Sequence, residues 1–83
     1  MSTVSTTMII EIQLYAILVK QFDIDISEID SFISIRGDLR ADPLKVTELM
    51  LALEDEFAVS IPKNTYKDIK NVHDIMEMLM LKV

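Results

Sequence analysis

The chain of 83 residues contains no cysteine and no tryptophan, and it has one glycine, two prolines and one histidine. Without cysteine it forms no disulfide and no thiolate metal site, which fits a reducing compartment. One histidine excludes a metal site built from several histidines, so we predict no metal site. The sequence shows no paired acid and base, no nucleophile beside a base and no glycine-rich phosphate loop. We therefore predict no catalytic residues and a protein that is not an enzyme.

Positive charge is also scarce, because eight Lys and Arg residues oppose 14 Asp and Glu residues and give a net charge of −6. Such an acidic surface repels phosphate backbones, so we expect a basic partner protein and no nucleic acid. The first seven residues carry no positive charge and do not resemble a signal peptide. The most apolar stretch, residues 8–19, is shorter than the roughly 20 residues of a membrane span. We expect a cytoplasmic protein with no membrane span.

Helical patterns cover most of the chain. A first helix is expected over about Val4–Lys20 and a second over Pro43–Phe57, where Asp42 is a typical N-cap and proline suits the first helical position. A short helical turn is expected over residues 65–69. Asn71 then caps a last helix, whose apolar stripe at helical spacing consists of Val72, Ile75, Met76, Leu79 and Val83.

Residues 21–42 hold the only glycine and many Asp and Ser residues. Their β-branched residues are compatible with a strand, but no second strand is available to pair with it. We therefore expect a long loop pinned to a helical core. The predicted fold is a single all-α domain over residues 1–83, a four-helix bundle of three main helices and one short helix, with a long loop between the first and second.

The second predicted helix has two apolar faces when successive residues are placed about 100° apart. The predicted core face consists of Val46, Leu49, Met50, Leu53 and Phe57. Leu44 and Leu51 lie nearly opposite, among acidic residues. This second face is either a solvated acidic surface with two incidental leucines or a docking strip, whose leucines provide affinity and whose acids steer a basic partner. The residues assigned to partner binding are Asp42, Leu44, Glu48, Leu51, Asp55 and Glu56.

The first predicted helix is apolar on two sides. Its core stripe consists of Ile10, Leu14, Ile17 and Leu18. A second stripe, on the opposite side, consists of Met8, Ile12, Tyr15 and Val19. A helix that is apolar all round is normally buried on both sides. Either the helix packs in another register and the long loop covers the surplus, or the second stripe is a surface for self-association into a homodimer.

Three segments keep a characteristic order and spacing. They read DLRADPL over Asp38–Leu44, ELMLALEDEF over Glu48–Phe57 and IP over Ile61–Pro62. They resemble the acyl carrier protein family, whose pattern is D-L-x-A-D-S-L, then V-E-L-x-x-A-L-E-E-E-F, then an I-P step. The resemblance implies a four-helix bundle whose long first loop leads into an attachment site. It also implies acyl groups carried as thioesters on a 4′-phosphopantetheine arm, which is joined to the serine of D-S-L, and partner enzymes that dock on the second helix.

The sequence departs from this pattern at the attachment position, where Pro43 stands in place of serine. Attachment is a phosphoryl transfer to a hydroxyl oxygen, and proline has none. Two other hydroxyls are candidates, Thr47 one turn further along the helix and Ser34 in the loop, but a transferase does not tolerate a displacement of several ångströms. We expect no cofactor and a protein-interaction or regulatory subunit of an acyl, fatty acid or polyketide-type pathway. The alternative is an active acyl carrier whose parent sequence has serine at position 43 and carries 4′-phosphopantetheine there.

Overall fold

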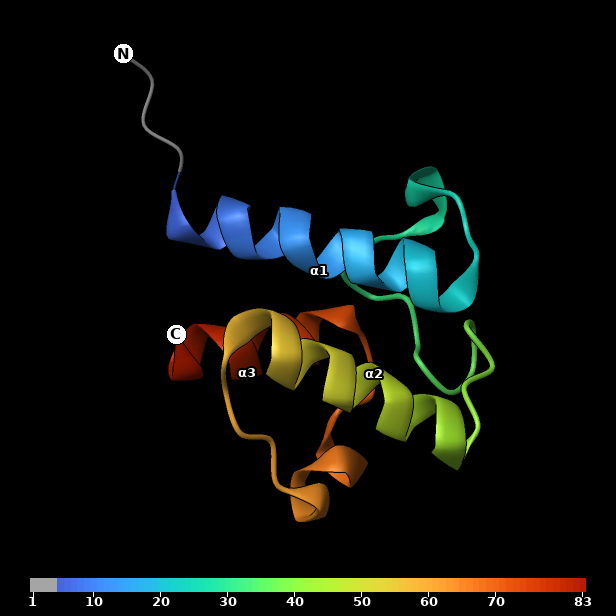
Figure 1. Ribbon diagram of the computed structural model, residues 1–83. Coiled ribbons are helices and arrows are strands. Elements are labelled where there is room, and N and C mark those ends of the chain that lie inside the picture. The colour runs from blue at the N-terminus through green and yellow to red at the C-terminus, as the bar shows by residue number, and fades with distance from the viewer. Residues whose placement is uncertain (1–4) are drawn as a thin grey trace.

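The structure is a computed structural model that describes residues 5–83. Figure 1 shows α1 running alongside α2 and α3, with the beginning of α1 on the same side of the molecule as the end of α3. The regular elements of residues 5–83 are all helices, and these residues contain no β-strand, so the predicted all-α fold is confirmed. The elements in chain order are α1 (Thr6–Phe22), η1 (Ile26–Glu28), α2 (Pro43–Phe57), η2 (Lys63–Asp68) and α3 (Val72–Lys82), in which η1 and η2 are short 3₁₀ helices.

The first helix begins and ends two residues later than predicted. The helix α1 begins after Ser5, whose hydroxyl accepts a hydrogen bond from the Met8 N–H at 3.1 Å. It continues two residues beyond the predicted end at Lys20 and stops at Asp23, which has a left-handed φ of 51°. The predicted beginning at Val4 lies outside the described residues. Helices commonly end at a glycine, and the absence of glycine here explains why the sequence did not mark this end.

The helix α2 has the predicted bounds, because its beginning is marked by two residues with clear preferences. Asp42 is the N-cap and Pro43 occupies the first helical position. The helix ends before Ala58, which adopts a left-handed conformation and donates its N–H to the Glu54 carbonyl oxygen. The short helix η2 also forms, although it begins two residues before the predicted turn.

The long loop between α1 and α2 is pinned to the bundle, as predicted. Ile29, Ile35 and Ala41 are buried in the core. The Ile35 N–H donates to the Lys70 carbonyl oxygen at 2.9 Å, and an isolated bridge pairs Ser34 with Asn71. The sequence analysis did not predict η1, although a reciprocal Asp25–Glu28 capping box marks its start.

The core lies where the helices meet and contains no buried polar side chain among residues 5–83. Its side chains from the helices are Ile10, Leu14, Leu18, Val46, Leu49, Met50, Leu53, Val72, Ile75 and Leu79. Four predicted core residues fall short of full burial. Ile17, Phe57 and Met76 are half-buried, and Val83 lies beyond the end of α3 and is 54% exposed. Within the described part of the chain, no helix has the length and apolar character needed to cross a membrane.

Candidate functional site

At the beginning of α2, backbone N–H groups are hydrogen-bonded to the N-cap residue Asp42. The Asp42 carboxylate accepts a hydrogen bond from the Lys45 N–H at 2.8 Å, and the Asp42 carbonyl oxygen accepts one from the Val46 N–H at 2.9 Å. Pro43 follows Asp42 and is exposed. Since the first N–H groups of a helix have no partner within it, a proline at this position loses no hydrogen bond.

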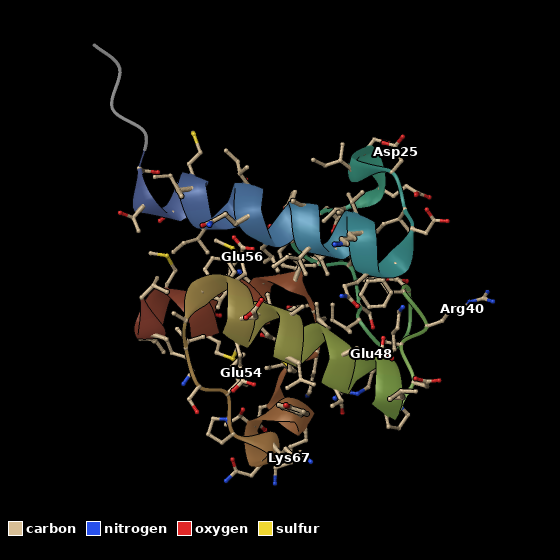
Figure 2. The ribbon with its side chains drawn as sticks, viewed as in Figure 1. Asp25, Arg40, Glu48, Glu54, Glu56 and Lys67 are labelled. Carbon is tan, nitrogen blue, oxygen red and sulfur yellow. The ribbon has the colours of Figure 1, made fainter. Side chains whose placement is uncertain are left out.

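A groove of about 450 Å³ lies beside this helix start. It is lined by Gln21, Phe22, Asp23, Leu39, Arg40, Asp42, Leu44, Lys45 and Glu48. The Lys45 ammonium lies 5.6 Å from the centroid of the Phe22 ring, which is a cation–π contact between α2 and the end of α1. Arg40 has a left-handed φ of 55°, and in Figure 2 its side chain extends away from the bundle. The groove therefore carries both signs of charge beside Pro43.

The hydroxyl groups named in the sequence analysis are engaged with the backbone. Thr47 is half-buried one turn beyond Pro43, and its hydroxyl donates to the Pro43 carbonyl oxygen at 3.0 Å. The Ser34 hydroxyl accepts a hydrogen bond from the Gly37 N–H at 2.9 Å. Neither hydroxyl occupies the position that a side-chain oxygen on residue 43 would have.

The docking strip, defined as Leu44, Glu48, Leu51 and Asp55, lies on the exposed side of α2. Leu44 is 67% exposed and Leu51 is 55% exposed, and the two acids are also exposed. In Figure 2, Glu48 lies partway along α2 and Glu56 lies near its C-terminal end. Glu56 is exposed but faces α1, because its carboxylate accepts a hydrogen bond from the Gln13 side chain at 3.1 Å. It therefore lies at the edge of the strip.

The second apolar stripe of α1 divides into two halves. Met8 is 53% exposed and Ile12 is 62% exposed, whereas Tyr15 and Val19 are half-buried against the core. Burial raises the pKa of the Tyr15 hydroxyl, the negative charges of two nearby acids raise it further, and a hydrogen bond with Ser31 opposes the rise. The long loop therefore approaches the half that contains Tyr15, and the accessible part of the stripe is its N-terminal half.

With this geometry described, similarity to known proteins identifies the family. Residues 13–79 match the family model described as "Phosphopantetheine attachment site". An acyl carrier protein from Helicobacter hepaticus is 38% identical over 61 residues, covering 74% of this chain and 80% of the relative. The chain belongs to the acyl carrier protein family. A second acyl carrier protein, from Thermosynechococcus vestitus, is 37% identical over 68 residues and aligns with 82% of this chain and 84% of its own.

A solved acyl carrier protein agrees in fold as well as in sequence. The structure from Enterococcus faecalis superimposes with a TM-score of 0.80 at 26% identity, covering 95% of this chain and 100% of that protein. The predicted family resemblance is thus confirmed. Acyl carrier proteins are carriers and not enzymes, so the prediction that this chain is not an enzyme is confirmed by its family.

Members of the acyl carrier family carry a 4′-phosphopantetheine group, and the beginning of α2 does not fit its covalent attachment at residue 43. The side chain of Pro43 consists of carbon and hydrogen atoms only and offers no oxygen for a phosphodiester. The proline changes the chemistry available here, while the N-cap and the helix retain their ordinary geometry.

Sequence reasoning missed two features around the site. The contact between Lys45 and Phe22 joins residues far apart in the chain, and no local pattern indicates it. The groove between α1 and α3, described below, was also missed. Outward-facing apolar residues near the C-terminus, such as Leu81, were its only signal in the sequence.

Proposed function

We propose that this chain is an acyl-carrier-type domain that receives no 4′-phosphopantetheine at residue 43 and acts through protein contacts. In this role it is an interaction or regulatory subunit of an acyl, fatty acid or polyketide-type pathway. The observation that carries the proposal is Pro43 at the first position of an otherwise ordinary α2. A domain of this family without an attachment oxygen keeps the surface of a carrier but has no arm to load.

The chemistry of attachment supports the first half of the proposal. Transfer of the arm requires a hydroxyl oxygen in line with the phosphorus atom of the donor. Thr47 offers the nearest hydroxyl on α2, but it lies one turn further along and donates to a backbone carbonyl oxygen. Holding the reacting atoms in attack geometry contributes a large part of such a rate, so an acceptor displaced by a helical turn reacts far more slowly.

The exposed face of α2 supports the second half. Leu44 and Leu51 provide apolar contacts, and Glu48 and Asp55 lie beside them in solvent. Apolar residues with acidic side chains beside them are suited to a partner with a basic surface, because the acids guide association and the apolar contacts slow dissociation. Asp42 and Glu56, at the two ends of this face, complete the proposed partner-binding set.

The alternative is an active acyl carrier whose parent sequence has serine at position 43. The intact surroundings of residue 43 favour it, because the Asp42 cap and the neighbouring groove are both in place. Serine is accepted in the first turn of a helix, so restoring it needs no rearrangement of α2. In this case 4′-phosphopantetheine is the cofactor.

The experiment compares the protein with its Pro43→Ser variant. Each is incubated with coenzyme A and a broad-specificity phosphopantetheinyl transferase, and the intact mass of each is then measured. We expect the variant to gain the mass of one arm and the unaltered protein to gain none. A gain on the unaltered protein would contradict the proposal, and a Thr47→Val variant would show whether that hydroxyl is the acceptor. If neither protein gains mass, the missing oxygen of residue 43 does not by itself explain why the arm is not attached.

Two further expectations stay predictions. Self-association into a homodimer would involve Met8 and Ile12, the exposed half of the second apolar stripe. A cytoplasmic location rests on the composition of the sequence alone.

A further inference from the structure

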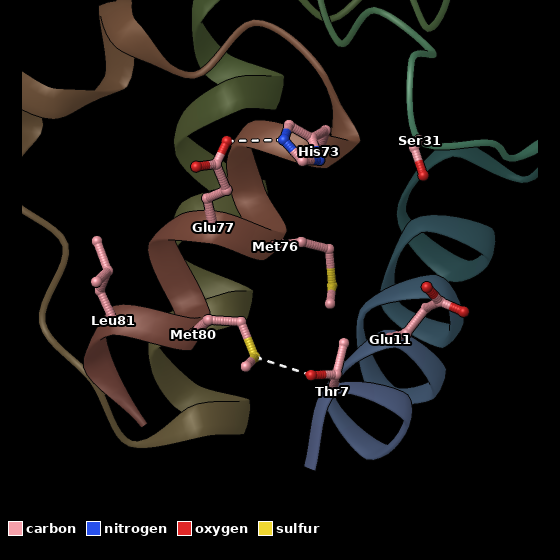
Figure 3. A pocket seen from close by; sticks show the side chains of 8 residues that line it. All are labelled: Thr7, Glu11, Ser31, His73, Met76, Glu77, Met80 and Leu81. Atoms are coloured by element: carbon pink, nitrogen blue, oxygen red, sulfur yellow. Dashed lines mark hydrogen bonds and ion pairs between the residues drawn. The ribbon is translucent and has the colours of Figure 1, made fainter. Parts of the chain in front are cut away.

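A second groove, of about 420 Å³, separates α1 from α3 (Figure 3). The two helices run in opposite directions, since the hydroxyl of Thr7 at the beginning of α1 donates to the Met80 sulfur near the end of α3 at 3.7 Å. In Figure 3, α2 lies behind α3 as seen from the groove. The groove therefore opens on a different face from the docking strip. It is lined by Thr7, Glu11, Ser31, His73, Met76, Glu77, Met80 and Leu81.

The apolar part of this groove is accessible and adaptable. Figure 3 shows the side chains of Met76 and Met80 extending from α3 toward α1. Met76 is half-buried, Met80 is 41% exposed, and Leu81 is 88% exposed. Methionine side chains adjust to the shape of what they bind, which is why they are frequent on surfaces that accept helices. Phe32, which is 78% exposed with its ring 6.4 Å from that of His73, adds an aromatic group beside the groove.

Apart from His73, the ionisable side chains that line this groove are acidic. Glu11 belongs to α1 and Glu77 to α3, so the two walls each contribute a carboxylate (Figure 3). Lys and Arg are absent from its lining, whereas Arg40 and Lys45 line the groove beside Pro43, and Lys20 lines a third groove between α1 and α2.

The two carboxylates are available to a partner. Glu77 lies 2.8 Å from the exposed His73 side chain, and Glu11 takes part in no ion pair within the described part of the chain. An exposed pair such as His73–Glu77 contributes little to stability, so a cation from a partner can replace it.

From these observations we propose that the groove between α1 and α3 binds a cationic amphipathic helix of a partner protein. The apolar side of that helix contacts Met76, Met80 and Leu81. Its Lys or Arg residues flank the apolar side and face Glu11 and Glu77. A groove between two antiparallel helices, with an apolar floor and charged walls, has the shape that accepts such a helix.

The charge distribution selects this occupant over a second copy of the chain. The protein has a net charge of −6, so a second copy would bring more negative than positive charge to Glu11 and Glu77. A neutral apolar segment would offer no charge to Glu11, which forms no ion pair within residues 5–83. A protein with this groove and the docking strip on different faces can hold two partners at once, and binding in the groove does not depend on which residue occupies position 43.

The test uses a helical peptide of leucine and lysine, about five turns long. Its affinity is measured by calorimetry and its position by the chemical-shift changes of the backbone amides. Two variants have equal changes in net charge: one carries Glu11→Lys and Glu77→Lys, and the other carries Ser60→Lys, Asn64→Lys and Asp68→Lys in the segment between α2 and α3, outside both proposed binding surfaces. We expect the first variant to bind about tenfold more weakly and the second to bind less than about twofold more weakly.

The shift changes should lie in the first half of α1 and in α3. All five substituted side chains are exposed, and unchanged circular dichroism would show that both variants fold. The proposal would be overturned if both variants bound the peptide equally weakly, or if the shift changes were confined to α2. It would also be overturned if a leucine–glutamate peptide bound as tightly as the leucine–lysine peptide. Occupation of the groove by a second copy would overturn it too, and would appear as concentration-dependent shifts without peptide.

Discussion

The two ends of α2 meet the requirements of the backbone in different ways. At the N-terminal end, Asp42 and Pro43 are residues that favour a helix start, and the cap hydrogen bond to Lys45 is 2.8 Å long. At the C-terminal end, Ala58 adopts a left-handed φ of 52°, a conformation that strains any residue with a Cβ atom. The backbone strain therefore lies at the C-terminal end of α2, whereas the family attaches its 4′-phosphopantetheine arm at the N-terminal end. At the N-terminal end, Pro43 has no side-chain oxygen and the helix start keeps its ordinary geometry, so the structural role of this position does not require a hydroxyl.

The largest expected effect concerns recognition of the N-terminal end of α2 by a phosphopantetheinyl transferase. In the Pro43→Ser background, adding Glu48→Lys and Asp55→Lys should lower the initial rate of arm transfer about tenfold, because the transferase then meets repulsive charges on α2. The rate is followed by intact mass over time. The matched control is the charge-reversed pair on the far groove, Glu11→Lys with Glu77→Lys, which should leave the rate within about twofold. Equal slowing by both pairs would mean that net charge alone, and not the strip, guides the enzyme.

The helix cap is expected to have a smaller effect, on stability. Asp42→Ala removes the acceptor of the Lys45 N–H and should lower the free energy of unfolding by about 1 kcal/mol. Asp42→Asn keeps an acceptor and should stay within a few tenths of a kcal/mol of the unaltered protein. Both values come from urea denaturation. An alanine variant as stable as the asparagine variant would show that the cap contributes nothing at this end.

The smallest expected effect is a gain in stability at the C-terminal end of α2. Ala58→Gly should raise the free energy of unfolding by about 0.5 kcal/mol, since relief of the left-handed strain exceeds the added entropy of the unfolded chain. Ala16→Gly, at an exposed position inside α1, is the control and should lower it by about 1 kcal/mol. If both glycine variants were destabilised alike, the strain assigned to Ala58 would be wrong.

The parts of the fold that the sequence predicts are those with strong local preferences. The bounds of α2 follow from Asp42 and Pro43, and the capping box of α3 follows from Asn71 and Asp74. The end of α1 was missed because Asp23 replaces the usual glycine. The helix η1 was missed although the spacing of its capping box was present in the sequence.

In the candidate site, too, the sequence predicts only the features that depend on local pattern. The face of α2 follows from helical periodicity, and Leu44 and Leu51 are exposed as that periodicity requires. The burial of Tyr15 depends on where the long loop lies, and the groove between α1 and α3 depends on how two helices distant in the chain pair. Local sequence patterns carry no information about such pairing, so these features emerge only from the folded chain.

The central claim is that the chain works without a covalently attached arm, and the intact mass of the protein isolated from its native host tests this most directly. Material purified without added coenzyme A or transferase is measured by mass spectrometry. The account predicts the mass of the bare polypeptide with Pro43 unmodified. A species heavier by one 4′-phosphopantetheine group, with the group located on any residue of α2, would contradict it.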